Sequence, residues 1–104
     1  MTERELGHRV LVRIGALPGV RVFRMNVGRA RAPNSQVVTF GVPGMGDYLV
    51  LVAGRYAWLE LKGPRGQQTP AQQAFQRMVH GLGGVYAVVR TVEDAVKAVE
   101  AAST

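Results

Sequence analysis

Asp47, Glu60 and Lys62 are the residues of this 104-residue chain whose types and spacing could do chemistry. The segment "DYLVLVAGRYAWLELK" reads as two strands joined by a turn at residues 53–55, with Asp47 opening one strand and Glu60 near the end of the other. Antiparallel pairing around that turn would place residue 47 opposite roughly residue 61, bringing the carboxylates together. Two close carboxylates repel unless a cation lies between them, and hard oxygen ligands suit Mg²⁺ or Mn²⁺.

Lys62 belongs with this pair because side chains alternate along a strand. Glu60 and Lys62 therefore share one face, while Leu59 and Leu61 share the other. The Leu61 carbonyl could add an oxygen ligand, and the Lys62 ammonium could orient a water or stabilise charge on a phosphate under attack. The alternative is that Asp47 only ends a glycine-rich turn and that Glu60 and Lys62 form a solvated strand face.

The elements that position these residues are predicted from periodicity and capping residues. Thr2, Thr69 and Thr91 each precede a helical pattern, and Pro70 strengthens the second start. The predicted elements are a helix over 3–17, a strand over 20–27, a basic loop over 28–35, a possible short strand over 36–42, the hairpin over 47–62, a helix over 70–82, a strand over 85–90 and a helix over 92–102. This order, α-β-β-β-α-β-α without the possible strand, predicts one α/β domain over 1–104, with a mixed central sheet flanked by helices.

The composition favours a polyanionic partner. Thirteen Lys and Arg against seven Asp and Glu give a net charge of +6 and a sequence pI near 10.8. Such an excess rewards binding to nucleic acid, because phosphates are neutralised and counterions released. The chain has no cysteine, which excludes disulfides and thiolate metal sites. No apolar run is long enough to span a membrane and the first residues are too polar for a signal peptide, so we expect a cytoplasmic protein.

Residues 44–94, "GMGDYLVLVAGRYAWLELKGPRGQQTPAQQAFQRMVHGLGGVYAVVRTVED", resemble the VRR-NUC (virus-type replication-repair nuclease) domain of the PD-(D/E)xK nuclease superfamily. The features that carry the resemblance are the Asp…Glu-x-Lys pattern, a glycine-rich loop, "TPAQ" opening a helix and "GGVYAVVRTVED" after it. The opening "TERELGHRV" and "VFRMNVG" are similar to the first helix and strand of that family, so the resemblance covers nearly the whole chain. It implies a restriction-endonuclease-like fold.

The resemblance also implies roles for individual residues. Asp47 and Glu60 would be metal ligands together with the Leu61 backbone carbonyl, and Lys62 the catalytic lysine. Gln72 of "TPAQ" would reach the site from its helix, with Gln73 as the neighbouring candidate. A first-turn glutamate of the first helix would join the metal site; we assign it to Glu3, with Glu5 as the alternative that the helix cap would use.

By the same resemblance, the activity would be that of a metal-dependent DNA endonuclease. Mg²⁺ would be the cofactor, with Mn²⁺ substituting, and the products would carry 5′-phosphates. Short stand-alone members resemble viral enzymes linked to homodimers that cut branched or four-way junction DNA, which would place this protein in a bacterial cell or phage-infected host and in DNA repair or recombination. The alternatives are a non-catalytic basic DNA-binding module that retains the fold, and a DNA-free interaction subunit.

Several other side chains have more than one interpretation. Four arginines in loops and strands near the predicted site are candidates for phosphate contacts or simply solvated; these are Arg24, Arg29, Arg31 and Arg65. Trp58 shares the Glu60 face and either packs on the sheet or walls the site. His8 and His80 are isolated on helices, which favours structural roles over catalysis.

Overall fold

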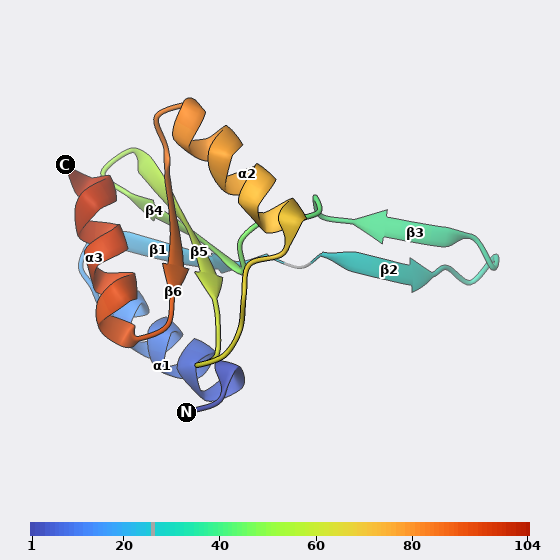
Figure 1. Cartoon of the computed structure of the whole chain (residues 1–104), viewed down its shortest axis with the longest axis horizontal. Helices are drawn as coiled ribbons and strands as arrows, with labels where there is room; N and C mark the ends of the chain where they lie inside the picture. Colours follow the sequence, from blue (N-terminus) through green and yellow to red (C-terminus); the bar gives the residue numbers. More distant parts are fainter. Residues whose placement is uncertain (26) are drawn as a thin grey trace.

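A four-stranded mixed sheet forms the centre of the molecule (Figure 1). The computed structural model describes residues 1–25 and 27–104. Its elements are α1 (Glu3–Gly15), β1 (Val20–Arg24), β2 (Gly28–Arg31), β3 (Val37–Phe40), β4 (Tyr48–Val52), β5 (Arg55–Leu61), α2 (Pro70–Gly81), β6 (Val85–Val89) and α3 (Val92–Ser103). The strand order is β1-β4-β5-β6; β5 and β6 run parallel and the other neighbours antiparallel. The predicted α/β class, a mixed sheet flanked by helices, is confirmed.

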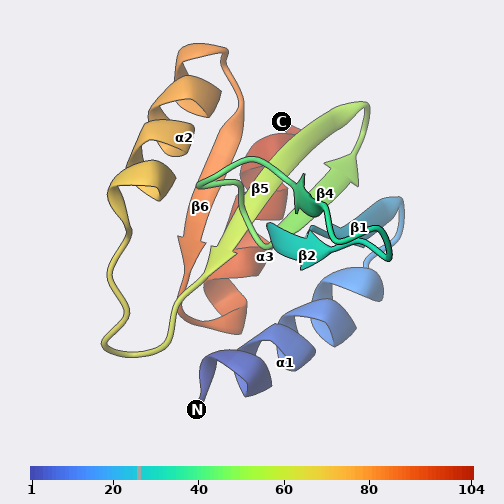
Figure 2. The ribbon, with the colours of Figure 1, turned by 90° about the vertical axis from the view of Figure 1, so that its right-hand side faces the viewer.

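The helices form two layers around this sheet (Figures 1 and 2). Alternation along β5 separates its faces, because Ala57, Leu59 and Leu61 join the main core while Trp58 and Glu60 point to the other side. The main core is completed by buried residues of α1 and α3, among them Leu6, Val10, Ile14, Ala95, Ala98 and Val99. Helix α2 covers the opposite face, where its Phe75 packs edge-on against Trp58 with ring centroids 5.3 Å apart.

The hairpin that carries the two carboxylates has a two-residue turn. Ala53 and Gly54 both have positive φ, 52° and 74°, as a turn between right-twisted strands requires. The pairing places Tyr48 opposite Leu59. Continued by one residue, this register sets position 47 opposite position 60, not roughly 61 as predicted from the sequence. The correction brings the two carboxylate-bearing positions directly across from each other.

The basic segment predicted as a loop over 28–35 is partly a strand. Residues 28–31 form β2, which pairs antiparallel with β3 in a two-stranded sheet of its own (Figure 1). "GRAR" lacks the apolar alternation of a half-buried strand, so only its backbone pairing with 37–40 reveals it. The predicted strand at 36–42 is present as β3. The strand predicted over 20–27 ends at Arg24, and its residue 26 lies outside the described residues.

The predicted helix starts are confirmed by their caps. Thr2 Oγ1 accepts the Glu5 N–H at 3.1 Å, and Thr69 and Thr91 each begin a full capping box. Helix α1 ends at Gly15, two residues before the predicted end. Within residues 1–25 and 27–104, no helix combines the length and apolar character needed to cross a bilayer.

Gly44 offers a test of how the loop before β4 is fitted against α2. Its φ is +84°, and an added methyl group would overlap the backbone carbonyl of Ala71 in the first turn of α2. Gly54, with φ +74°, has open space instead. Both glycine-to-alanine changes should cost on the order of 1 kcal/mol through backbone strain. Gly44→Ala should lower the free energy of unfolding further, measured by urea denaturation; equal losses for Gly44→Ala and Gly54→Ala would contradict this close fit.

Candidate active site

Asp47 is held by backbone hydrogen bonds at the junction of three strands. Its Oδ2 accepts the Leu61 N–H of β5 at 2.7 Å, and its own carbonyl accepts the Met25 N–H just after β1 at 2.8 Å. These bonds fix the carboxylate beside the end of β5. Burial is the main cause that raises the pKa of Asp47, and the charges of Glu3 and Glu60 add to it.

Glu60 is fully buried, with 0% of its surface exposed. Its Oε1 accepts hydrogen bonds from the Tyr86 hydroxyl at 2.5 Å and from Gln68 Nε2 at 3.3 Å. Lys62 Nζ lies 3.6 Å from Oε2, an ion pair longer than a hydrogen bond, and its side chain is 13% exposed. Among the described residues Oε2 has no hydrogen-bond partner. The alternative of a solvated Glu60/Lys62 strand face is therefore wrong.

A layer of aromatic and amide side chains encloses the Glu60 carboxylate from the α2 side. Phe75 packs between Trp58 and Tyr86, the second pair with centroids 5.9 Å apart, which confirms packing for Trp58. Gln76 Oε1 accepts from Gln68 Nε2 at 2.7 Å and so orients the amide that reaches Glu60. Burial, and then the hydrogen bond to Glu60, raise the pKa of Tyr86, which keeps its hydroxyl protonated as a donor.

Sequence reasoning missed Tyr86, Gln68 and Gln76. The parallel register sets Tyr86 beside Trp58 and on the Glu60 face, so a hydroxyl inside an otherwise apolar strand was the available signal. Gln68 and Gln76 carried none, because a loop and a helix face bring them together. Gln72, which was predicted to reach the site, has its Oε1 bonded to Thr69 N–H at 2.8 Å in the helix cap. In the structure, the glutamine in contact with Glu60 is Gln68.

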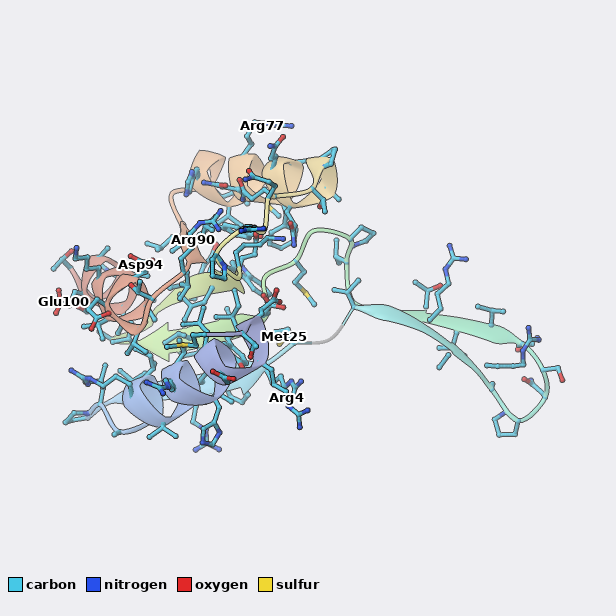
Figure 3. The ribbon with its side chains drawn as sticks, turned by 60° about the horizontal axis from the view of Figure 1, so that its bottom comes forward. Arg4, Met25, Arg77, Arg90, Asp94 and Glu100 are labelled. Carbon is cyan, nitrogen blue, oxygen red and sulfur yellow. The ribbon has the colours of Figure 1, made fainter. Side chains whose placement is uncertain are left out.

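Arg90 was also missed, and it holds the loop that covers Lys62. Its Nη1 donates to the Gly63 carbonyl at 2.9 Å and its Nη2 to the Gly66 carbonyl at 2.8 Å (Figure 3). An added methyl group at Gly66 would lie 3.1 Å from Lys62 Cδ, so the loop packs directly on the lysine stem. Arg65 is exposed in the same loop. The side chain of Lys62 is thus confined between the loop and Glu60.

A cavity of about 550 Å³ opens beside Asp47. Its lining includes Glu3, His8, Arg24, Asp47, Tyr48 and Leu61. Glu3, Arg24 and Leu61, which were predicted as site residues, thus share this cavity with Asp47. Arg29 and Arg31 lie away from it on the β2–β3 hairpin. His80 contacts the Tyr86 carbonyl at 3.2 Å, as expected for a structural histidine.

The environment of Asp47 raises its pKa above the ordinary value of 3.8. Desolvation by burial is the largest cause, and the charges of Glu3 and Glu60 add to it. The Leu61 N–H and the Lys62 ammonium act in the opposite direction but do not cancel the effect. The folded protein therefore binds a proton at Asp47 more tightly than the unfolded chain does.

The donor set fits a small divalent cation with an incomplete protein shell. The buried Glu60 Oε2, which accepts no hydrogen bond among the described residues, and the destabilised Asp47 carboxylate are two acceptors that a further positive charge would satisfy. Within the described ranges, however, no three His, Asp or Glu side chains cluster closely enough to hold a metal, so Glu3 does not complete a three-carboxylate group. Mg²⁺ commonly binds one or two carboxylates and takes its other ligands from water and phosphate, which suits this set.

The fold of the chain matches that of a solved structure. A structure described as a VRR_NUC domain superposes with a TM-score of 0.66, covering 96% of this chain and 97% of that chain, at 22% sequence identity. The chain therefore has the VRR_NUC fold, as the resemblance drawn from its sequence implied. No family sequence model and no curated protein sequence matches it.

Tyr86→Phe tests the support of Glu60. The change removes the donor to Glu60 Oε1 while keeping the ring against Phe75. Because a buried carboxylate loses a hydrogen bond, the free energy of unfolding should fall by about 1–3 kcal/mol in urea denaturation. Tyr56→Phe is the matched control, since Tyr56 lies on the same sheet face but is 36% exposed. Equal effects from the two substitutions would contradict the role of the Tyr86 hydroxyl.

Asp47→Asn should stabilise the fold at neutral pH. A carboxyl whose folded pKa is raised contributes stability below the unfolded value of 3.8, and that contribution is lost as pH rises through the folded pKa. The amide carries no charge, so the Tm gain over wild type should be largest near neutral pH and shrink on acidification toward about pH 4. Glu100→Gln, at an exposed position of α3, is the control. A Tm difference that ignores pH would refute the electrostatic account.

Proposed function

We propose that this chain is a metal-dependent nuclease that hydrolyses phosphodiester bonds in DNA. The observation that carries the proposal is the arrangement of Asp47, Glu60 and Lys62 at one end of the β4–β5 hairpin within a VRR_NUC fold. A carboxylate pair of which one member is buried and lacks a full set of partners is costly for a purely structural role. Binding of a cation during catalysis would offset that cost.

Asp47, Glu60 and the Leu61 carbonyl would hold Mg²⁺, or Mn²⁺ in its place. The cation would supply a Lewis acid that neutralises phosphate charge and lowers the pKa of a water molecule. Lys62 supplies a fixed positive charge for the negative charge that develops as water oxygen bonds to phosphorus and the P–O3′ bond breaks. The products are a 5′-phosphate and a 3′-hydroxyl. The aromatic layer over Glu60 keeps water from the buried side of the site.

DNA is the proposed substrate because of the charge and where it lies. Arg24 lines the cavity beside Asp47, and Arg65 is exposed in the loop over Lys62. Both arginines would contact phosphates of a DNA strand bound at the carboxylates. With Arg29 and Arg31 on the β2–β3 hairpin, they belong to a chain of net charge +6.

Branched or four-way junction DNA is the proposed preferred substrate, cut by a homodimer in a bacterial cell or phage-infected host. Cutting both strands of a branch requires two sites, and two copies of the chain would supply one each. The exposed apolar side chains of the sheet face beside α2, including Phe23 and Leu51, offer a surface for pairing.

Lys62→Ala should abolish cleavage without abolishing DNA binding. Loss of one charge that acts on the developing phosphate charge typically costs about 10²–10³ in rate. The measurement is cleavage of a labelled four-way junction and a linear duplex with Mg²⁺, Mn²⁺ or EDTA. Lys97→Ala is the matched control, because Lys97 is the other lysine of the chain and lies exposed on α3.

Two other outcomes would revise the proposal. If wild type binds DNA in a salt-dependent way but cuts nothing with either metal, the chain is a non-catalytic DNA-binding module, which the complete burial of Glu60 would then explain. If cleavage requires Lys62 but light scattering shows only monomer at the working concentration, the paired-cut model is wrong while the nuclease remains.

A further inference from the structure

The β2–β3 hairpin, residues 28–40, projects from the body as an arm (Figures 1 and 3). In the described structure its two strands contact each other and no other helix or strand. The radius of gyration is 14.4 Å, whereas a compact chain of this length has about 13 Å. An isolated two-stranded hairpin is marginally stable in water, so an arm without support from the body needs another source of order.

The tip of the arm is internally organised. Ala32 N–H donates to the Gln36 carbonyl at 2.8 Å and Ser35 N–H to the Ala32 carbonyl at 2.9 Å, with Ser35 at φ 67°. Arg31 Nη1 also donates to the Ser35 carbonyl at 2.9 Å, across the turn. The arm is therefore shaped before any ligand binds, which lowers the entropy cost of binding.

The two faces of the arm differ in chemistry. Directly opposed residues of an antiparallel pair point to the same side, so Arg29 with Thr39 and Arg31 with Val37 form one face. The opposite face carries the pair Ala30 and Val38. All of these side chains are exposed. The arm thus offers arginine and hydroxyl donors on one side only.

Acidic side chains are absent from the part of the sequence that carries the arm. Residues 6–46, which include the whole arm, contain six arginines and no Asp or Glu, and two of these arginines, Arg29 and Arg31, lie on the arm itself. Asp94 and Glu100 of α3 lie on the side of the molecule away from the arm, whereas Arg4 lies toward it (Figure 3). A polyanion would be drawn to the arm side, and a second copy with the same basic arm would be repelled there.

The base of the arm is bonded to the candidate active site. Met25 N–H, before the arm, donates to the Asp47 carbonyl, and the Tyr86 hydroxyl that holds Glu60 also contacts the Gly44 carbonyl, after the arm, at 3.1 Å. A ligand that follows the arm to its base therefore arrives at Asp47. This continuity points to one ligand that spans both.

We propose that the arm is a DNA-binding ribbon that lies in the major groove of the duplex next to the candidate active site. The major groove is about 12 Å wide and admits a two-stranded β-ribbon. At about 3.3 Å per residue the arm reaches roughly 17–20 Å from Gly28 to its tip. That length covers about five or six base pairs, at about 3.4 Å each. This role of the arm rests on DNA being the ligand, as in the proposed function, but does not require that the DNA be cut.

The test compares wild type with an armless variant, in which Asn-Gly replaces residues 29–39. Gly28 and Phe40 are opposed at the base of the arm, and Asn-Gly forms the two-residue turn that joins such a pair. Because the arm contacts no other described element, the Tm should not change. Binding is measured by fluorescence anisotropy in EDTA, on a plain duplex and on one whose major groove is filled by glucosylated hydroxymethylcytosines.

Wild type should bind the glucosylated duplex at least about tenfold more weakly than the plain one. The glucose groups would exclude the arm from the major groove, and a tenfold change in Kd corresponds to the loss of about one good contact to a base edge. The armless variant should bind the plain duplex more weakly than wild type and show equal affinity for both. Netropsin, which fills the minor groove, should not compete with the arm.

Point variants keep the test valid if the armless protein fails to fold. Arg29→Gln should reduce the slope of log Kd against log salt by about 0.9, the value of one phosphate contact. Arg77→Gln removes the same charge from the outer side of α2, away from the arm (Figure 3), and should leave the slope unchanged. Val38→Gln, on the opposite arm face, should also leave it unchanged.

Three results would overturn the inference. The first is that wild type and armless protein discriminate equally between the two duplexes, and the second is that Arg29→Gln and Arg77→Gln have equal salt slopes. The third is that removal of the arm converts a dimer to a monomer without changing the affinity for DNA, which would make the arm a contact between copies. Arm-dependent groove binding by a protein that cuts nothing would refute the nuclease proposal and leave the arm's role standing.

Discussion

Burying the carboxylate of Glu60 imposes a constraint that the rest of the site must meet. An ionised carboxylate without partners in a protein interior costs several kcal/mol. In this chain a tyrosine hydroxyl, a glutamine amide and a lysine ammonium from three different segments offset that cost. Each partner has its own support. Tyr86 packs on Phe75 of α2, and Lys62 is enclosed by the loop that Arg90 holds. The position of α2, the loop after β5 and strand β6 are therefore coupled through one side chain.

The two carboxylates of the site, Glu60 and Asp47, differ in burial and in the groups that hold them. Glu60 is fully enclosed, whereas Asp47 faces a cavity and accepts backbone N–H groups at its side chain and at its main-chain carbonyl. Burial and two neighbouring carboxylates raise the pKa of Asp47, so the folded protein keeps an unfavourable interaction at neutral pH. Such stored repulsion is relieved by a cation or a proton.

Sequence reasoning predicted the fold where local signals and burial agree. Thr69 with Pro70 begins α2, and the apolar hairpin around residues 53–54 is as expected. It failed where pairing or tertiary contact decides. Strand β2 has no apolar pattern of its own, and the register of β4 with β5 differs by one residue from the expected one. In the site, Asp47, Glu60 and Lys62 could be found because they share one hairpin. Gln68, Gln76 and Arg90 could not, because a loop and two elements distant in sequence bring them together.

The division of the chain into a body and an arm separates two physical tasks. In the body, the packed apolar core holds the Glu60 carboxylate within hydrogen-bond distance of its partners. The arm contributes nothing to that core, so its sequence is free to carry arginine without acidic neighbours. The bonds at its base, from Met25 to Asp47 and from Tyr86 to Gly44, join the two parts at the carboxylates themselves. A duplex seated along the arm would therefore have its orientation relative to Asp47 and Glu60 set by backbone contacts, while the arginine charges add salt-dependent affinity and faster association.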